Sequence, residues 1–258
     1  MQFKELFSGN DDLKLLRHFY DNIYVAEFPD PNERESYANI VTYLRAAGSR
    51  ESGYHVVLAI AGGSPAGCTI TDYFASSNTG VIEFLVVAPE MRGRGIGSQL
   101  LRDAEERLSA DAEQRGHTLA FIAAEINDPF ESACTPDNVD PFERARWWGR
   151  RGYEKLGFPY VQPALSPQQQ PARNLMLAAK LFSGKPSNAV PAAAVDGFVR
   201  DYLIYAMRID DPVSSPEYVE MARFLHSRPA VSLIPMLSYA AEDRSAPEAG
   251  PGRSGNRA

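Results

Sequence analysis

The sequence contains little cysteine: Cys68 and Cys134 are the only two in 258 residues, and they lie far apart. No Cys-x-x-Cys pair and no cluster of histidine and cysteine occurs, so a zinc site with the usual ligand spacing is not expected. The four histidines are scattered, and none belongs to a motif. We therefore expect no metal cofactor, and we expect each cysteine to be a small core or loop residue.

Long apolar runs and an excess of positive charge are also missing. No apolar stretch reaches the roughly 20 residues that a membrane-spanning helix needs. The first seven residues lack the basic start and apolar core of a signal peptide, so we expect a cytoplasmic protein without a membrane partner. The formal net charge of −7 argues against general binding to nucleic acid phosphates. It favours solubility and would mildly attract a cationic amine.

Strand and helix signals alternate over residues 1–182, which we expect to form one domain. The order is a strand, two helices, three strands, a helix, a strand, a helix and two strands, which predicts a mixed α/β sheet with helices on both faces. The strands are expected at 3–7, 55–61, 67–75, 81–87, 119–126, 156–161 and 175–181, and the helices at 11–26, 32–47, 95–114 and 141–151.

Residues 183–239 are predicted to form a helical extension. Val195, Phe198, Val199 and Tyr202 fall at helical spacing, and a second helix start follows at 215–217. The apolar faces of these helices are expected to pack on the core or against a second subunit, which leaves a homodimer open. Residues 240–258 are rich in proline and glycine, and this composition predicts a disordered tail.

Residues 85–101 are the most informative stretch, because an apolar strand there ends at a proline and glycines then open an amphipathic helix. Glycines let successive backbone N–H groups converge, and the N-terminus of a helix binds phosphate. Arg92 and Arg94 can add charge-assisted contacts. The stretch lacks the Gly-Lys-Ser/Thr ending of a P-loop, and Ser98 stands where a dinucleotide-binding motif has its third glycine.

The loop resembles the R-x-x-G-x-G signature of the GNAT superfamily of acyl-CoA N-acyltransferases, whose three fixed positions match Arg92, Gly95 and Gly97. The element order over residues 3–182 and the stretch 146–153 are also similar. The resemblance implies a mixed, mostly antiparallel sheet that splays at the CoA site, with acetyl-CoA as co-substrate. It also implies that the strand backbone bonds the pantetheine arm and that the loop holds the pyrophosphate. The implied CoA-binding residues are Leu85, Val86, Val87, Arg92, Gly93, Arg94, Gly95, Ile96, Gly97, Ser98 and Trp148.

Two glutamates are candidates for the catalytic base. Glu83 interrupts an apolar strand, where a carboxylate is costly unless it faces a cavity or is paired. Strand alternation places it on the same face as Leu85, and it resembles the strand glutamate proposed as base in polyamine acetyltransferases. The alternative is a structural ion pair with an arginine. Glu125 follows the apolar run 119–124, where it would grip a cationic substrate or lie in solvent as a strand-end carboxylate.

At the position where many members of this family carry the general acid, the sequence differs from the family pattern. Many GNAT proteins carry an aromatic residue followed by tyrosine before the last hairpin, whereas this chain has Trp147 and Trp148. An indole has no titratable proton near neutral pH, so Trp148 is expected to pack on the CoA arm or to donate a hydrogen bond to sulfur. Tyr153 and Tyr160 are the remaining tyrosine candidates, and packing is the alternative role of each.

The resemblance implies an N-acetyltransferase that moves an acetyl group from acetyl-CoA to a primary amine of a small molecule, by direct attack in a ternary complex. The long loop 160–171 is expected to border the acceptor. The acidic residues Glu27, Asp30, Glu33 and Glu35 point weakly to a cationic acceptor. Two alternatives stay open: a regulatory module that senses CoA without turnover, and an enzyme that acetylates a protein or aminoacyl-tRNA, which the acidic charge disfavours.

Overall fold

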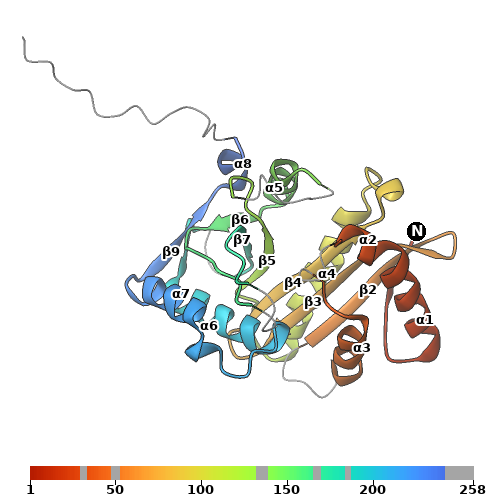
Figure 1. The fold of residues 1–258 in the computed structure, drawn as a ribbon, viewed down its shortest axis with the longest axis horizontal. Helices are drawn as coiled ribbons and strands as arrows, with labels where there is room; N and C mark the ends of the chain where they lie inside the picture. The colour runs from red at the N-terminus through yellow and green to blue at the C-terminus, as the bar shows by residue number, and fades with distance from the viewer. Residues whose placement is uncertain (30–33, 48–52, 132–138, 165–169, 184–186, 242–258) are drawn as a thin grey trace, which may run out of the picture.

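The computed structural model describes residues 1–29, 34–47, 53–131, 139–164, 170–183 and 187–241. Its strands form one nine-stranded sheet in the order β1-β2-β3-β4-β5-β7-β6-β9-β8 (Figure 1). Neighbouring strands are antiparallel except for β4 and β5, which run parallel. The strands are β1 (Gln2–Glu5), β2 (Gly53–Ala61), β3 (Ser64–Phe74), β4 (Thr79–Val87), β5 (Phe121–Asn127), β6 (Glu154–Leu156), β7 (Leu175–Leu181), β8 (Ala189–Pro191) and β9 (Ala230–Ile234).

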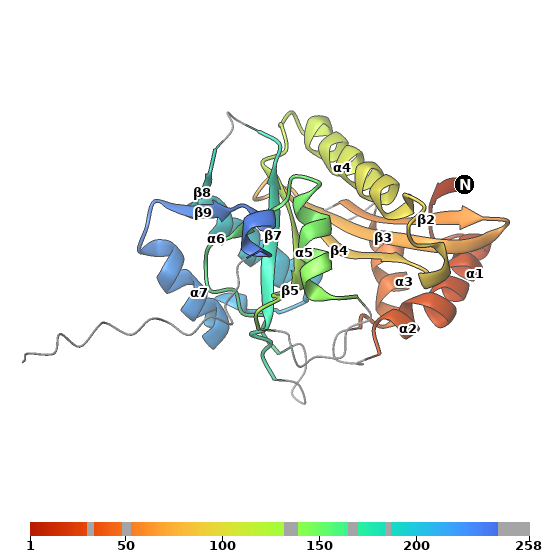
Figure 2. The same cartoon turned by 90° about the horizontal axis from the view of Figure 1, so that it is seen from above.

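Helices cover both faces of this sheet. In Figure 2, α4 lies above strands β2–β4, and α1–α3 lie below them. Helices α6 and α7 pack on β5 and β7, where Phe198 and Met221 share an apolar cluster with Phe121 and Leu177. The helices are α1 (Asn10–Phe19), α2 (Val25–Glu27), α3 (Tyr37–Ala46), α4 (Ile96–Gln114), α5 (Pro141–Gly149), α6 (Ala192–Asp201), α7 (Pro216–His226) and α8 (Met236–Tyr239), with π-helical turns at Tyr20–Tyr24 and Tyr202–Ala206.

The predicted mixed, mostly antiparallel sheet with helices on both faces is confirmed. The strand predicted at 156–161 is wrong in its position, because β6 ends at Leu156. The chain then turns on itself: the N–H of Phe158 donates to the Leu156 carbonyl at 2.9 Å, and Pro159 has no N–H to give. Cys68 is buried in the core as expected, while Cys134 lies outside the described residues.

Residues 183–239 contain the two predicted helices, α6 and α7, but they also contribute two strands to the sheet. Strand β9 pairs with β6, where Leu233 lies opposite Leu156, and β8 pairs with β9. In addition, the Asp201 carboxylate accepts hydrogen bonds from Ser76 and Ser77 in the turn between β3 and β4. The division of the chain at residue 182 stays a prediction, and the predicted tail lies outside the described residues from 242 onward.

None of the described helices combines the length and the apolar character that crossing a membrane would require.

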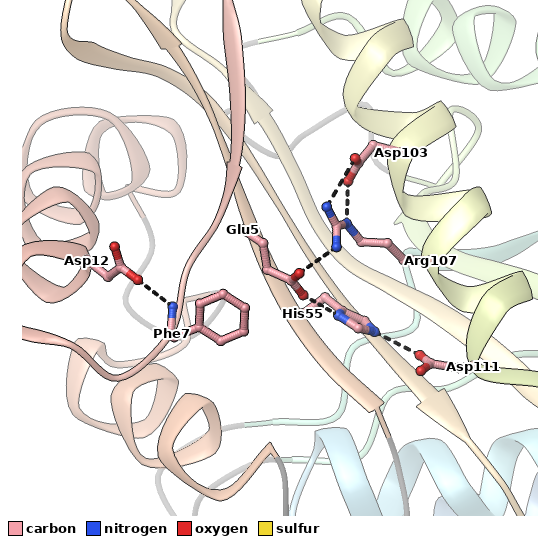
Figure 3. A network of polar contacts seen from close by, with 7 residues as sticks. All are labelled: Glu5, Phe7, Asp12, His55, Asp103, Arg107 and Asp111. Atoms are coloured by element: carbon pink, nitrogen blue, oxygen red, sulfur yellow. Dashed lines mark hydrogen bonds and ion pairs between the residues drawn. The ribbon is translucent and has the colours of Figure 1, made fainter. Parts of the chain in front are cut away.

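A polar network fastens α4 to the first two strands (Figure 3). The His55 ring on β2 contacts Glu5 of β1 at 2.7 Å through Nδ1 and Asp111 of α4 at 2.8 Å through Nε2. Arg107 of α4 bonds the other Glu5 oxygen at 2.6 Å and also bonds Asp103. Burial lowers the pKa of His55, but the hydrogen bonds that its ring donates to Asp111 and Glu5 outweigh this effect and raise that pKa to about 9.

We expect His55→Gln to lower the free energy of unfolding by about 1–3 kcal/mol at pH 6, because it removes hydrogen bonds between a cation and two carboxylates. The folded-state pKa exceeds the unfolded value, so this stabilisation is complete below about pH 6.5 and is lost as pH rises through about 9. Urea unfolding at pH 6, 8 and 10 measures it, with the exposed His18→Gln as control. An equal cost at pH 6 and pH 10 would contradict the assignment.

Candidate active site

Strands β4 and β5 pair over three residues only. Val81 lies opposite Ala123, and the last pair joins Ile82 to Ala124. Beyond this pair β4 continues to Val87 with β3 as its strand partner, and β5 continues to Asn127 paired with β7. The two edges that face each other there have no strand partner among the described residues. Backbone N–H and C=O groups need hydrogen-bond partners, so a ligand with amide groups can bind between the strands.

A β-bulge lies at Glu83, where the strands begin to diverge. On β3, Ile70 pairs with Phe84 and the next residue, Thr71, pairs with Ile82, which leaves Glu83 as the extra residue of β4. Bulges of this kind redirect a side chain and bend the strand. A change in direction at the bulge also separates β4 from β5.

The bulge corrects the expected orientation of Glu83. Simple alternation would put it on the face of Leu85, but Leu85 packs with Ile82 in the cluster beneath α4 and α5. The Glu83 charge acts instead on tyrosines of the opposite face: it adds to the effect of burial in raising the pKa values of Tyr54 and Tyr202. Glu83 therefore belongs to the face covered by α1–α3 and by the segment after α6.

A cavity of about 1090 Å³ occupies the space between the diverging strands. It extends from the loop before α4 to the segment after α2 and to the residues around 162 and 172, which belong to the loop predicted to border the acceptor. Arg94 is not part of its lining and donates instead to the Glu90 carbonyl at 3.3 Å. The other predicted site residues line the cavity: Glu83, Leu85, Val86, Val87, Arg92, Gly93, Gly95, Ile96, Gly97, Ser98, Glu125 and Trp148.

The loop before α4 has the conformation that its glycines permit. Gly93 and Gly95 have φ values of +73° and +80°, in the left-handed region that other residues rarely adopt. Helix α4 begins at Ile96, so the first N–H groups of the helix have no intrahelical partner. At Gly97 a side chain would meet Trp147, since a Cβ atom there would lie 3.3 Å from the indole Cζ2. The result is an open helix N-terminus that can bind an anion.

Arg92 lies at the edge of this loop and is already bonded to protein groups. Its guanidinium forms an ion pair with Glu27 at the end of α2, and its Nε donates to the Val87 carbonyl at 3.1 Å. The Arg92 side chain is 34% exposed and that of Glu27 is 10% exposed. In the sequence Glu27 stands out only by its charge, because a contact between residues 65 positions apart leaves no local signal.

Glu83 and Glu125 follow directly after the last pair of β4 and β5, one on each strand. Glu125 accepts a hydrogen bond from the Tyr160 hydroxyl, so it is not the solvated strand-end carboxylate of the simpler interpretation. Burial, together with the Glu125 charge, raises the pKa values of Tyr160 and Tyr202 well above the usual range. Both tyrosines therefore remain protonated. Tyr202 comes from the 183–239 region, where the sequence pattern predicts only that it belongs to an apolar helix face.

The two tryptophans have different surroundings. Trp148 is 6% exposed and packs against Tyr153, with ring centroids 4.7 Å apart. Trp147 is more exposed and lies under the guanidinium of Arg151, 3.6 Å from its ring centroid. Neither Tyr153 nor Tyr160 lines the cavity. Tyr153 donates to Glu105 at 3.2 Å, and burial raises its pKa, so these two tyrosines are poorly suited to protonate a leaving group.

Comparisons with known proteins agree with this geometry. Residues 16–130 match the model of the Acetyltransferase (GNAT) family. A GNAT-family acetyltransferase structure from Bacteroides thetaiotaomicron aligns with a TM-score of 0.58 at 16% identity, over 81% of this chain and all of the other, which shows the fold. A ribosomal-protein-alanine N-acetyltransferase from Brucella melitensis aligns with a TM-score of 0.48 at 18% identity, over 70% of this chain and all of the other. No curated protein matches the sequence. The match over residues 16–130 indicates the GNAT acetyltransferase domain of an acyl-CoA-dependent N-acetyltransferase.

Proposed function

We propose that this protein transfers the acetyl group of acetyl-CoA to a primary amine of a small molecule, by direct attack in a ternary complex. One observation carries the proposal. A single cavity joins the helix N-terminus that can bind phosphate, the unpaired edge of β4 and two carboxylates. These are the parts needed to hold a CoA thioester and to deprotonate an amine beside it.

The residues around the loop fit CoA. The left-handed Gly93 and Gly95 leave space that no side chain fills, and the free N–H groups at the start of α4 can receive a pyrophosphate. Arg92 supplies a cation at the same edge. The β4 edge from Leu85 to Val87 offers backbone groups to the amides of the pantetheine arm.

The acetyl transfer requires few protein groups. The amine nitrogen bonds to the thioester carbon, the carbon–sulfur bond breaks, and the sulfur leaves as a thiolate. A β4 backbone N–H can polarise the thioester carbonyl, and such donors contribute about 3–4 kcal/mol each in other enzymes. Glu83 or Glu125 takes the proton from the amine. Trp148 packs against the donor arm and supplies no proton, so the thiolate takes its proton from water.

The acceptor side favours a small cation. Glu83 and Glu125 line the cavity together with Phe28 and Phe84, and carboxylates beside aromatic rings recognise an ammonium group by charge and by ring contacts. The net charge of −7 disfavours a tRNA acceptor.

Thiol release from acetyl-CoA, measured with a panel of amines, tests the proposed function. We expect release that depends on a small primary amine and saturates with it. Binding of CoA without release for any amine would instead identify the sensing module. Release that requires a peptide or an aminoacyl-tRNA would reject the small-molecule acceptor.

Removal of the catalytic base should affect rate more than folding. We expect Glu83→Gln to lower kcat/KM by about 100-fold or more and to remove the acidic limb of the pH profile, because the amide cannot accept the amine proton. Glu125→Gln tests the second carboxylate in the same way, and Glu106→Gln on the exposed side of α4 is the matched control. An unchanged pH profile in Glu83→Gln would exclude Glu83 as the base.

The ion pair of Arg92 gives a paired test of the donor site. We expect Arg92→Ala to weaken CoA binding about tenfold or more in calorimetry, because a charge-assisted contact to phosphate is lost. Glu27→Gln keeps the guanidinium and removes its competing carboxylate, so its CoA affinity should equal or exceed that of the parent protein. Weaker binding in Glu27→Gln than in Arg92→Ala would show that the pair is structural only.

A further inference from the structure

A second cavity of about 430 Å³ adjoins the large one, and we call it the annex. Both cavities are lined by Ser98, Trp147, Arg150 and Arg151, so the annex opens beside the start of α4. Along α4 it follows one helical face, since Ser98, Leu101, Arg102 and Glu105 lie in its wall at helical spacing. A ligand that binds at the N-terminus of α4 therefore borders the annex.

The annex is strongly cationic. Arg102, Arg150, Arg151 and Lys180 line it, with Glu105 as its single carboxylate. The whole chain has a net charge of −7, so this concentration of positive charge is the opposite of the average surface. Such a cavity favours an anion.

The protein's own carboxylates neutralise the annex only in part. Lys180 pairs with Glu105 at 2.8 Å, and Arg150 approaches Glu143 at 4.0 Å where both side chains are 57% exposed. Arg102 forms no ion pair within the part of the chain that the structure describes. Two or more positive charges thus remain for a ligand.

Arg151 is held in place without a carboxylate. Its Nη1 donates to the Trp147 carbonyl at 2.7 Å, and its Nη2 donates to the Ser98 hydroxyl. The buried Nε has no hydrogen-bond partner among the described residues. Burial and the neighbouring Arg150 charge lower the pKa of Arg151, as expected where two guanidinium groups lie close together.

We propose that the annex binds the phosphate monoester on the ribose of CoA, and that Arg102 and Arg150 make the donor site selective for the phosphorylated nucleotide. This inference rests on the proposed function, because it requires CoA to bind at the loop before α4. The pyrophosphate and the phosphate monoester are separate anions of one molecule, and the loop and the annex are adjoining anion sites. A phosphate dianion is the group that two guanidinium forks bind most strongly.

Calorimetry with CoA and with 3′-dephospho-CoA tests the annex directly. We expect the parent protein to bind CoA about tenfold or more tightly than 3′-dephospho-CoA, because charge-assisted hydrogen bonds to the monoester are lost. The double variant Arg102→Gln/Arg150→Gln should lose most of this preference while its affinity for 3′-dephospho-CoA stays the same. Both side chains are exposed, so the fold should be retained, and thermal unfolding checks this. Arg228→Gln, an exposed arginine after α7, is the matched control.

Each outcome decides the inference. Equal affinity of the parent protein for the two ligands would overturn the annex and leave the proposed function intact. A preference that survives in the double variant would overturn the role of these arginines. Absence of binding by both ligands would overturn the proposed function together with the annex. Titration with inorganic phosphate identifies another source of the anion: binding that depends on the arginines, without a preference for CoA, would assign the annex to a separate anion and reject the proposal.

Discussion

The loss of pairing between β4 and β5 after Ile82 and Ala124 is the constraint on which the rest of the site depends. A parallel pair in the middle of a sheet is normally continuous, because its backbone groups are buried and need partners. Here the pair opens after three residues, and the freed edges become the walls of a cavity. The bulge at Glu83 lies at the same point, and it turns a carboxylate toward the face opposite α4.

The structure on either side of this opening supports different chemistry. On the α4 side lie the left-handed glycines, the helix N-terminus and the cationic annex, all suited to phosphate. On the other side, the Tyr160 hydroxyl donates a hydrogen bond to Glu125, and the charges of both carboxylates help to raise the pKa of Tyr202. A half-buried carboxylate is costly unless it is hydrogen-bonded or faces a polar cavity, and this arrangement supplies both conditions. Under the proposed function, the nucleotide and the amine therefore bind on opposite sides of the sheet.

The conformation of the loop before α4 can be predicted from the sequence because its signal is local. Positive φ angles at Gly93 and Gly95, the proline before them and the amphipathic helix after them all lie within about one supersecondary unit. The mixed sheet with helices on both faces also follows from the alternation of elements. By contrast, the direction of Glu83 depends on register with β3, which the strand's own sequence does not reveal.

Long-range contacts account for the other differences. Strand β9 is five residues long, and its pairing with β6 joins residues almost 80 positions apart. No local sequence pattern therefore predicts this pairing. The side chains that contact the predicted site residues also come from distant parts of the sequence. Glu27 pairs with Arg92, and Tyr160 donates to Glu125. The strand expected at 156–161 fails at Pro159, where the missing N–H and the turn after Leu156 end the ladder.

Hydrogen–deuterium exchange of the parent protein, with and without CoA, tests the central claim most directly. If the donor arm binds the open edge of β4, CoA should slow exchange in peptides that span Glu83–Val87 and the loop up to Ser98. Peptides from β2, which is paired on both sides, should not change. Saturating CoA with unchanged exchange over 83–98, or protection confined to other strands, would contradict the account.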